Sequence, residues 1–159
     1  MKVEYINPFV ASTQNVFATM LECEISRADV ALKSQPEPGY DVNAIIELSG
    51  RATGTVVLSL ERSVAIKAAS VMLREELSEV NDDVVDAVGE LANILTGGAK
   101  AKLEELALHV SLPRVSLGRT PLECFPENSS PICISFDCPW GGVMLEVGLV
   151  EEMAEIPAG

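Results

Sequence analysis

The spacing of apolar residues between positions 82 and 107 predicts one long amphipathic helix. These residues recur every three or four positions and form a single stripe: Val84, Val88, Leu91, Leu95, Ala99, Leu103 and Leu106. At about 100° per residue, Asp86, Glu90, Asn93 and Gly97 project within about 60° of one another on the opposite side. A carboxylate and a carboxamide three residues apart are neighbours on a helix surface and can address one external target together. We therefore expect the functional site of the protein to lie on this polar face.

Two features of the same segment bear on docking. Gly97 and Gly98 each cost the helix about 1 kcal/mol relative to alanine. Because Gly97 lies one turn beyond Asn93 on the polar face, it would let another surface approach closely. Asp82 and Asp83, with Asp86, stand in the first turns, where carboxylates interact favourably with the helix dipole. Asp86 also shares the face of Glu90 and is a second candidate for docking.

Two further helices are predicted. Asn7 fits a helix cap and Pro8 the first helical position, and apolar residues then repeat at helical spacing to about Leu21. The other helix follows Glu61-Arg62-Ser63 and closes at Leu73. Asn81 or Asp82 would cap the long helix.

The remaining apolar runs predict strands. They cover residues 24–35, 42–48, 52–60, 112–118, 132–136 and 143–150. Ser49-Gly50-Arg51 joins the second and third of them as an antiparallel hairpin, and Pro113 favours an edge position for the fourth. Residues 36–39 and 119–130 are expected to be loops, and the acidic tail from Glu151 to Gly159 is expected to fray. This order predicts an α+β fold in which a largely antiparallel sheet is covered by long helices.

Length and charge narrow the class of protein. The 159 residues fit a single domain, and a low aromatic content of 4% implies a core of Val, Leu, Ile and Ala. The formal net charge of −13 argues against nucleic acid and anionic membranes as partners, because both need clustered Lys and Arg. No apolar signal segment opens the chain and no run is long enough to span a membrane, so a cytoplasmic location is expected.

Metal and redox sites are not expected. Cys23, Cys124, Cys133 and Cys138 include no C-x-x-C pair, and His109 is the only histidine. A hairpin would make a Cys133–Cys138 disulfide conceivable, although four reduced thiols are favoured. His109 is expected to end the long helix, where a cationic group suits the dipole. No glycine-rich phosphate loop occurs. For Trp140, packing in a hairpin is favoured over an exposed interface role.

The polar face also supports a family comparison. Gly89-Glu90-x-x-Asn93, followed by Gly97-Gly98 and preceded by Asp82 and Asp86, resembles the E-x-x-N helix of the CheX/CheC/FliY chemotaxis phosphatases, and CheX members most of all. Asn7-Pro8-Phe9, Gly50-Arg51 and residues 112–118 are similar to further landmarks of that family. The resemblance extends over nearly the whole chain.

The resemblance implies a function for the helix. Asn93 would hold a water in line with the phosphorus of an aspartyl phosphate in a CheY-like response regulator, and Glu90 would pair with a lysine of that regulator. The phosphorylated aspartate and Mg²⁺ would belong to the partner, so this chain would need no metal or other cofactor of its own. The alternative is a non-catalytic relative, similar to CheX or to flagellar-switch proteins, that binds a receiver domain without turnover.

The resemblance also implies an internal duplication and a homodimer. Aligning Asn15 with Asn93 places Ser12 where Glu90 would be, so the first half lacks the acidic partner and one site per chain is expected. A homodimer would exchange or pair strands of the Ile132–Val150 hairpin, whose strong β pattern would be hazardous as an open edge.

Overall fold

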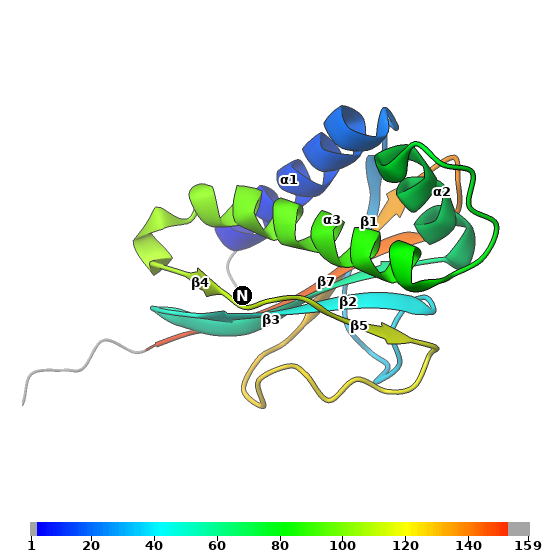
Figure 1. The fold of residues 1–159 in the computed structure, drawn as a ribbon. Helices are drawn as coiled ribbons and strands as arrows, with labels where there is room; N and C mark the ends of the chain where they lie inside the picture. The colour runs from blue at the N-terminus through cyan, green and yellow to red at the C-terminus, as the bar shows by residue number, and fades with distance from the viewer. Residues whose placement is uncertain (1–2, 153–159) are drawn as a thin grey trace, which may run out of the picture.

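Within residues 3–152, seven strands form one antiparallel sheet and three helices pack on one of its faces (Figure 1). The computed structural model describes these residues, so positions 153–159 of the predicted tail lie outside the described part. The predicted α+β class, an antiparallel sheet covered by helices, is confirmed.

The strand order places two segments at the edges of the sheet. The strands are β1 (Ser26–Leu32), β2 (Val42–Ser49), β3 (Ala52–Leu60), β4 (His109–Val110), β5 (Arg114–Leu117), β6 (Ile132–Asp137) and β7 (Val143–Glu151). Their order is β1-β6-β7-β3-β2, with β4 and β5 both paired to the outer side of β2. The edge position predicted from Pro113 is therefore confirmed.

The Ile132–Val150 hairpin does not lie at an open edge of the sheet, so the β pattern of its strands does not argue for a dimer. β6 pairs with β1 on one side and β7 on the other, and β7 lies between β6 and β3. Both strands are thus interior, and the hairpin leaves no unpaired edge that a second chain would have to cover. The strong β pattern of the two strands reflects burial within the sheet.

The first helix begins earlier than predicted. α1 spans Val3–Leu21, and Pro8 lies inside it rather than at its first position. The apolar side chains of Tyr5 and Ile6 are buried in the core, which holds an additional turn in helical conformation before Pro8. The Tyr5 hydroxyl also donates a hydrogen bond to Glu151 at the end of β7.

The long helix ends earlier than predicted. α3 spans Asp82–Ala101, and the side chain of Asn81 caps it by accepting from the Val84 N–H at 3.0 Å. A 3-10 turn over Glu104–Leu106 follows, so Leu103 and Leu106 are buried without belonging to the helix. The tighter turn brings apolar residues to the same side every three positions, which the sequence pattern does not separate from a continuing α-helix. His109 then lies in β4, not at a helix end.

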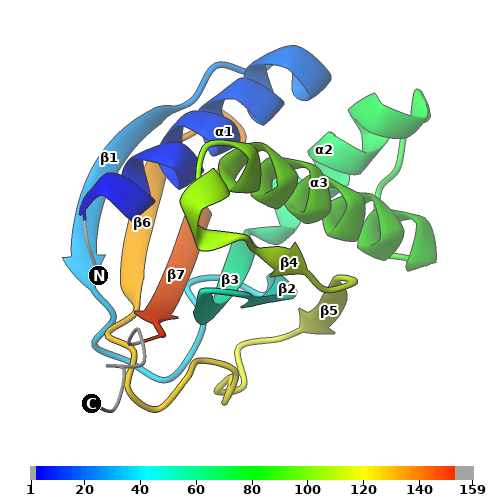
Figure 2. The same cartoon turned by 90° about the vertical axis from the view of Figure 1, so that its left-hand side faces the viewer.

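The core lies between the inner face of the sheet and the helices. α3 runs between α1 and α2 (Arg62–Leu73) and packs against β2 (Figure 2). The segment between β5 and β6 covers the opposite face of the sheet, where the Thr55 hydroxyl donates to the Cys124 carbonyl at 2.5 Å. This segment was predicted to be a loop and has no helix or strand. Trp140, in the β6–β7 turn, packs partly buried against the core as predicted.

The β2–β3 turn packs against the 3-10 turn that follows α3. Gly50 has a φ of 140°, in the region that favours glycine, and a Cβ there would collide with the Ala107 carbonyl. The Arg51 N–H donates to the Leu106 carbonyl at 2.8 Å. The predicted hairpin is thus confirmed, and its turn contacts the segment that follows α3.

The neighbour of Cys138 is Cys23, not Cys133. The sulfur atoms of Cys23 and Cys138 lie 3.9 Å apart, between the end of α1 and the end of β6, and all four cysteines are free thiols. The Cys133 sulfur instead lies 3.8 Å from a carboxylate oxygen of Glu146. Burial raises the pKa of Cys23 to about 11, with a smaller contribution from Cys138.

This geometry predicts which disulfide forms on oxidation. With oxidised glutathione, Cys138 would form a mixed disulfide and release one glutathione, and Cys23 would then displace the second to close the Cys23–Cys138 bridge. Because the thiolate is the nucleophile, closure should be slow at pH 8 and should accelerate as the pH rises towards the pKa of Cys23. Peptide mapping by mass spectrometry checks the pairing. A Cys133–Cys138 peptide as the main product would contradict it.

Candidate functional site

Burial on three sides fixes the orientation of α3. Its apolar stripe is confirmed: Val84, Val88, Leu91, Leu95 and Ala99 are all buried. On the α1 side, the Ser12 hydroxyl donates to the Leu95 carbonyl at 2.5 Å. On the other side, Gly89 lies against the β5 edge, where a Cβ would meet Pro113 and Val115 at 3.5 and 3.6 Å. A helix held on both flanks and from below cannot turn about its axis without breaking these contacts.

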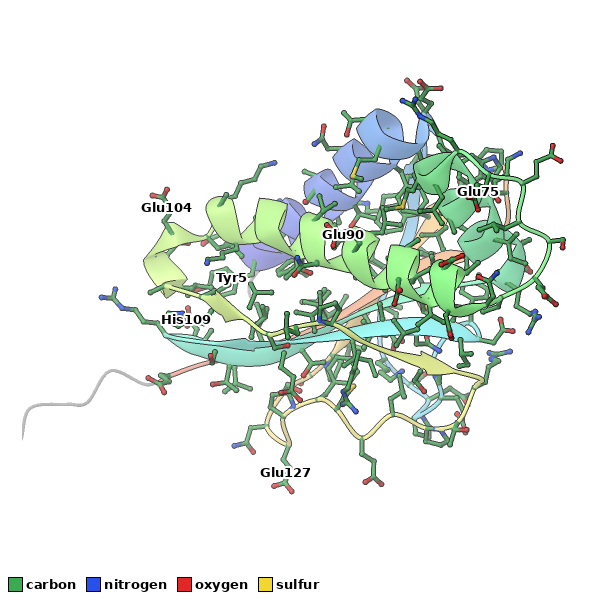
Figure 3. All side chains as sticks on the ribbon, viewed as in Figure 1. Tyr5, Glu75, Glu90, Glu104, His109 and Glu127 are labelled. Carbon is green, nitrogen blue, oxygen red and sulfur yellow. The ribbon has the colours of Figure 1, made fainter. Side chains whose placement is uncertain are left out.

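The predicted polar face is the exposed face. Asp86, Glu90, Asn93 and Gly97 are all exposed on α3. Figure 3 shows Glu90 projecting from the middle of the helix, away from the sheet. Among residues 3–152, the side chains of Glu90 and Asn93 make no hydrogen bond or ion pair with this chain. Their carboxylate and carboxamide are therefore available to an external partner.

The two glycines of α3 have different roles. A Cβ at Gly98 would clash with the Ser12 hydroxyl, so glycine there allows α1 to pack closely. A Cβ at Gly97 would meet nothing within 4 Å. Gly97 borders a surface depression of about 540 Å³, whose other residues include Lys100, Leu103 and Leu108. The internal packing of the chain thus explains Gly98 and leaves Gly97 unexplained.

The aligned face of α1 is not a second exposed site. Ser12, at the position that corresponds to Glu90, is buried against α3, and its hydroxyl is used by Leu95. Asn15 is exposed, but no acidic residue accompanies it in the matching position. This arrangement supports the expectation of one site per chain.

The other candidates lie away from Glu90 or have structural roles. Asp82 and Asp83 occupy the first turn of α3, where the dipole favours them. His109 lines a different surface depression, of about 520 Å³, with Glu47 and residues 123–126. No three His, Cys, Asp or Glu side chains within residues 3–152 gather closely enough to hold a metal ion. The helices of this part of the chain include none that could cross a membrane.

Sequence reasoning missed two neighbours of the site. The sequence presents Ser12 only as a possible counterpart of Glu90, whereas its hydroxyl supports α3 by donating to the Leu95 carbonyl. Pro113 was interpreted only as a sign of an edge strand, whereas it packs beside Gly89, one residue before Glu90. Both contacts join segments far apart in the chain, so local spacing carries no signal for them.

The glycine pair provides a test of this packing. Gly97→Ala should stabilise the protein by about 1 kcal/mol, because alanine favours the helix and the added methyl meets open space. Gly98→Ala should destabilise it, because the methyl would clash with Ser12. Urea denaturation of the two variants measures both changes, and Ser12→Ala combined with Gly98→Ala should recover part of the loss. Equal effects of the two single substitutions would contradict the packing described here.

The sequence of this chain is similar to those of known chemotaxis proteins. The family model described as "Chemotaxis phosphatase CheX" matches residues 42–137, which include β2, β3, α2 and the whole of α3. The "CheY-P phosphatase CheX" of Thermotoga maritima is 26% identical over 122 residues, which cover 75% of this chain and 79% of that protein.

Two solved structures extend the similarity to the fold. A CheC-like superfamily protein from a Shewanella species is 28% identical with a TM-score of 0.85, covering 94% of this chain and 99% of that one. The CheX chain of a CheX–CheY–BeF3–Mg²⁺ complex from Borrelia burgdorferi superposes with a TM-score of 0.79 at 23% identity, covering 94% and 100%. Together with the family match over α3 and the sheet, these similarities confirm the resemblance seen in the sequence: the chain belongs to the CheX family of chemotaxis phosphatases.

Proposed function

We propose that this chain hydrolyses the aspartyl phosphate of a phosphorylated CheY-like response regulator, as a single cytoplasmic domain over residues 1–159. The observation that carries the proposal is the pair Glu90 and Asn93, exposed without internal partners on a helix that is fixed on three sides. Membership of a phosphatase family and the E-x-x-N spacing support this assignment of the site.

Asn93 is the group assigned to the attacking water. Hydrolysis of an acyl phosphate needs a water in line with the phosphorus and stabilisation of charge more than covalent help from the protein. A carboxamide can accept a hydrogen bond from that water through its oxygen and donate through its nitrogen. Because Asn93 projects from a rigid helix, it can enter the partner's acid pocket with little loss of conformational freedom.

Glu90 is assigned to docking and register. Its carboxylate would pair with a lysine of the regulator and orient the helix so that Asn93 reaches the phosphoryl group. Asp86 extends the acidic side of the same face by one turn, and Gly97 permits close approach at the other end. We assign both to the contact surface rather than to the chemistry.

Mg²⁺ and the phosphorylated aspartate are assigned to the partner. The described part of this chain offers no cluster of metal ligands, and the Borrelia complex contains CheX together with CheY, BeF3 and Mg²⁺. The chain therefore supplies two side chains to a site that is completed on binding.

Substitution of Asn93 tests the site. Asn93→Ala should lower the rate of phosphate release from a phosphorylated CheY-like receiver by about 10²–10³, the usual cost of losing a group that stabilises the transition state. Because the position is an exposed helix position, the fold and receiver binding should be retained. Glu90→Ala should weaken both binding and turnover.

Asn15→Ala on α1 is the matched control, since it removes the same exposed side chain from the face without a carboxylate. Asn15→Ala should leave the rate of phosphate release unchanged. If the Glu90→Ala/Asn93→Ala double variant matched the wild-type rate, the site would lie elsewhere. If the wild-type chain bound phosphorylated receivers without turnover, the alternative of a non-catalytic interaction domain would replace the phosphatase.

We also propose a homodimer, now through β1 instead of the β6–β7 hairpin. All seven residues of β1 are exposed, and among residues 3–152 this strand pairs only with β6, which leaves its outer edge open to another chain. Val30 and Leu32 are 40% and 69% exposed on it. An open edge with apolar side chains favours pairing with another chain.

Light scattering at tens of micromolar should therefore show a dimer. Leu32→Lys should shift the protein towards the monomer, because a lysine on an edge strand opposes pairing. Leu117→Lys, at the opposite edge of the sheet, is the control and should remain dimeric. A monomeric wild-type protein would overturn the proposal.

A further inference from the structure

The edge strand beside α3 contains a β-bulge. β4 and β5 both pair with β2, but in registers that differ by one residue: Leu48 lies opposite Val110, and Ile45 lies opposite Arg114. Between these pairs, Ile46 and Glu47 of β2 face three residues, Ser111, Leu112 and Pro113. β4 and β5 are thus one edge strand with an extra residue in its middle, as in a β-bulge.

The bulge is held in place by hydrogen bonds and by α3. The Ser111 N–H donates to the Glu47 carbonyl at 2.9 Å, and the Glu47 N–H donates to the Ser111 hydroxyl oxygen at 2.9 Å. The same hydroxyl donates to the Leu112 carbonyl at 3.1 Å. Pro113 packs beside Gly89 of α3. These contacts fix the backbone on both sides of Leu112.

Leu112 is held almost fully in solvent. Its side chain is 90% exposed, more than that of Leu32, Leu117 or Leu73. A bulge and a proline on an edge strand also protect against unwanted pairing, as charged side chains do, but an exposed apolar side chain does not. A fixed, exposed leucine works against such protection, so edge protection does not explain it.

The position of the bulge relates Leu112 to the site. Pro113 borders α3 at Gly89, the residue before Glu90, and Asn93 lies one turn further along the helix. At about 100° per residue, Asn93 is displaced only about 40° from Gly89, so it stands on the bulge side of the polar face. The strand from β4 to β5 passes alongside this part of α3 (Figure 1).

We propose that Leu112 is an apolar docking contact for the receiver domain whose aspartyl phosphate is hydrolysed by the water that Asn93 positions. This inference rests on the proposed function. A protein interface combines apolar side chains that lose their water with charged groups that set orientation. The polar face of α3 carries Asp86, Glu90 and Asn93, and the bulge places a strongly exposed leucine next to it. The receiver should therefore carry an apolar side chain beside its acid pocket, and the bulge should contribute to the choice among receivers.

The test compares Leu112→Ser with Leu117→Ser. Leu117 is 54% exposed on the same edge, about five residues or roughly 16 Å further along the strand. Phosphate release is measured against the concentration of the CheY-like receiver, phosphorylated with acetyl phosphate, that the wild-type chain dephosphorylates fastest among several. Leu112→Ser should raise KM about tenfold with kcat unchanged, and Leu117→Ser should alter neither. Calorimetric binding of the same receiver loaded with Mg²⁺ and beryllofluoride should weaken about tenfold for Leu112→Ser alone.

Four other results would contradict the proposal, each in a different way. If the wild-type chain releases phosphate from no receiver, the proposed function fails. If the wild-type chain is active and Leu112→Ser has the same KM and the same receiver affinity as the wild type, the docking role of Leu112 is rejected and the proposed function stands. If both leucine variants weaken binding equally, the whole edge is the contact and the bulge has no special role. If Leu112→Ser instead changes the oligomeric state in light scattering, the occupant is a second copy of this chain and the proposal is overturned.

Discussion

The candidate site depends above all on the burial of one side of α3. Leu91 and Leu95 are fully buried between the helix and the sheet, and truncating such a side chain typically costs about 2–5 kcal/mol. Substitutions of exposed residues typically change stability by only about 0.5 kcal/mol. The core therefore decides which way Glu90 and Asn93 face, and the two residues are free to serve chemistry because the fold does not need them.

In the proposed mechanism, this chain provides only half of the active site. The chain presents a carboxylate and a carboxamide on a rigid helix, and everything that holds the phosphoryl group is assigned to the partner. Selectivity must then come from surfaces around the two side chains rather than from a pocket. The depression beyond Gly97 and the bulge beside Gly89 flank the polar face at different points and have different chemistry. They are the natural places for related chains to differ in the receivers that they accept.

The sequence predicted which side of α3 is exposed more accurately than it predicted where the helices begin and end. The 3.6-residue period of α3 reports directly which side is buried, so the exposed positions of Glu90 and Asn93 followed from it. The same period did not show where α3 ends, because the 3-10 turn keeps Leu106 buried at a compatible spacing. Pro8 predicts a helix start, but contacts of Tyr5 and Ile6 with the core hold a further turn before it, and the local pattern does not show these contacts. Strand neighbours, the Cys23–Cys138 approach and the bulge at Leu112 depend on pairing between distant segments, which no local pattern encodes.

The turn at Gly50 has a consequence for how this fold can vary. A two-residue turn between antiparallel strands is ordinarily a site where chains accept insertions, because it lies at the periphery. Here the turn touches the Ala107 carbonyl, and the Arg51 N–H is bonded to Leu106, just after α3. Lengthening the turn would push against the segment that ends the site helix. Natural insertions, affinity tags and circular permutation should therefore be excluded from this hairpin, and the long segment between β5 and β6 offers the freer place for added sequence.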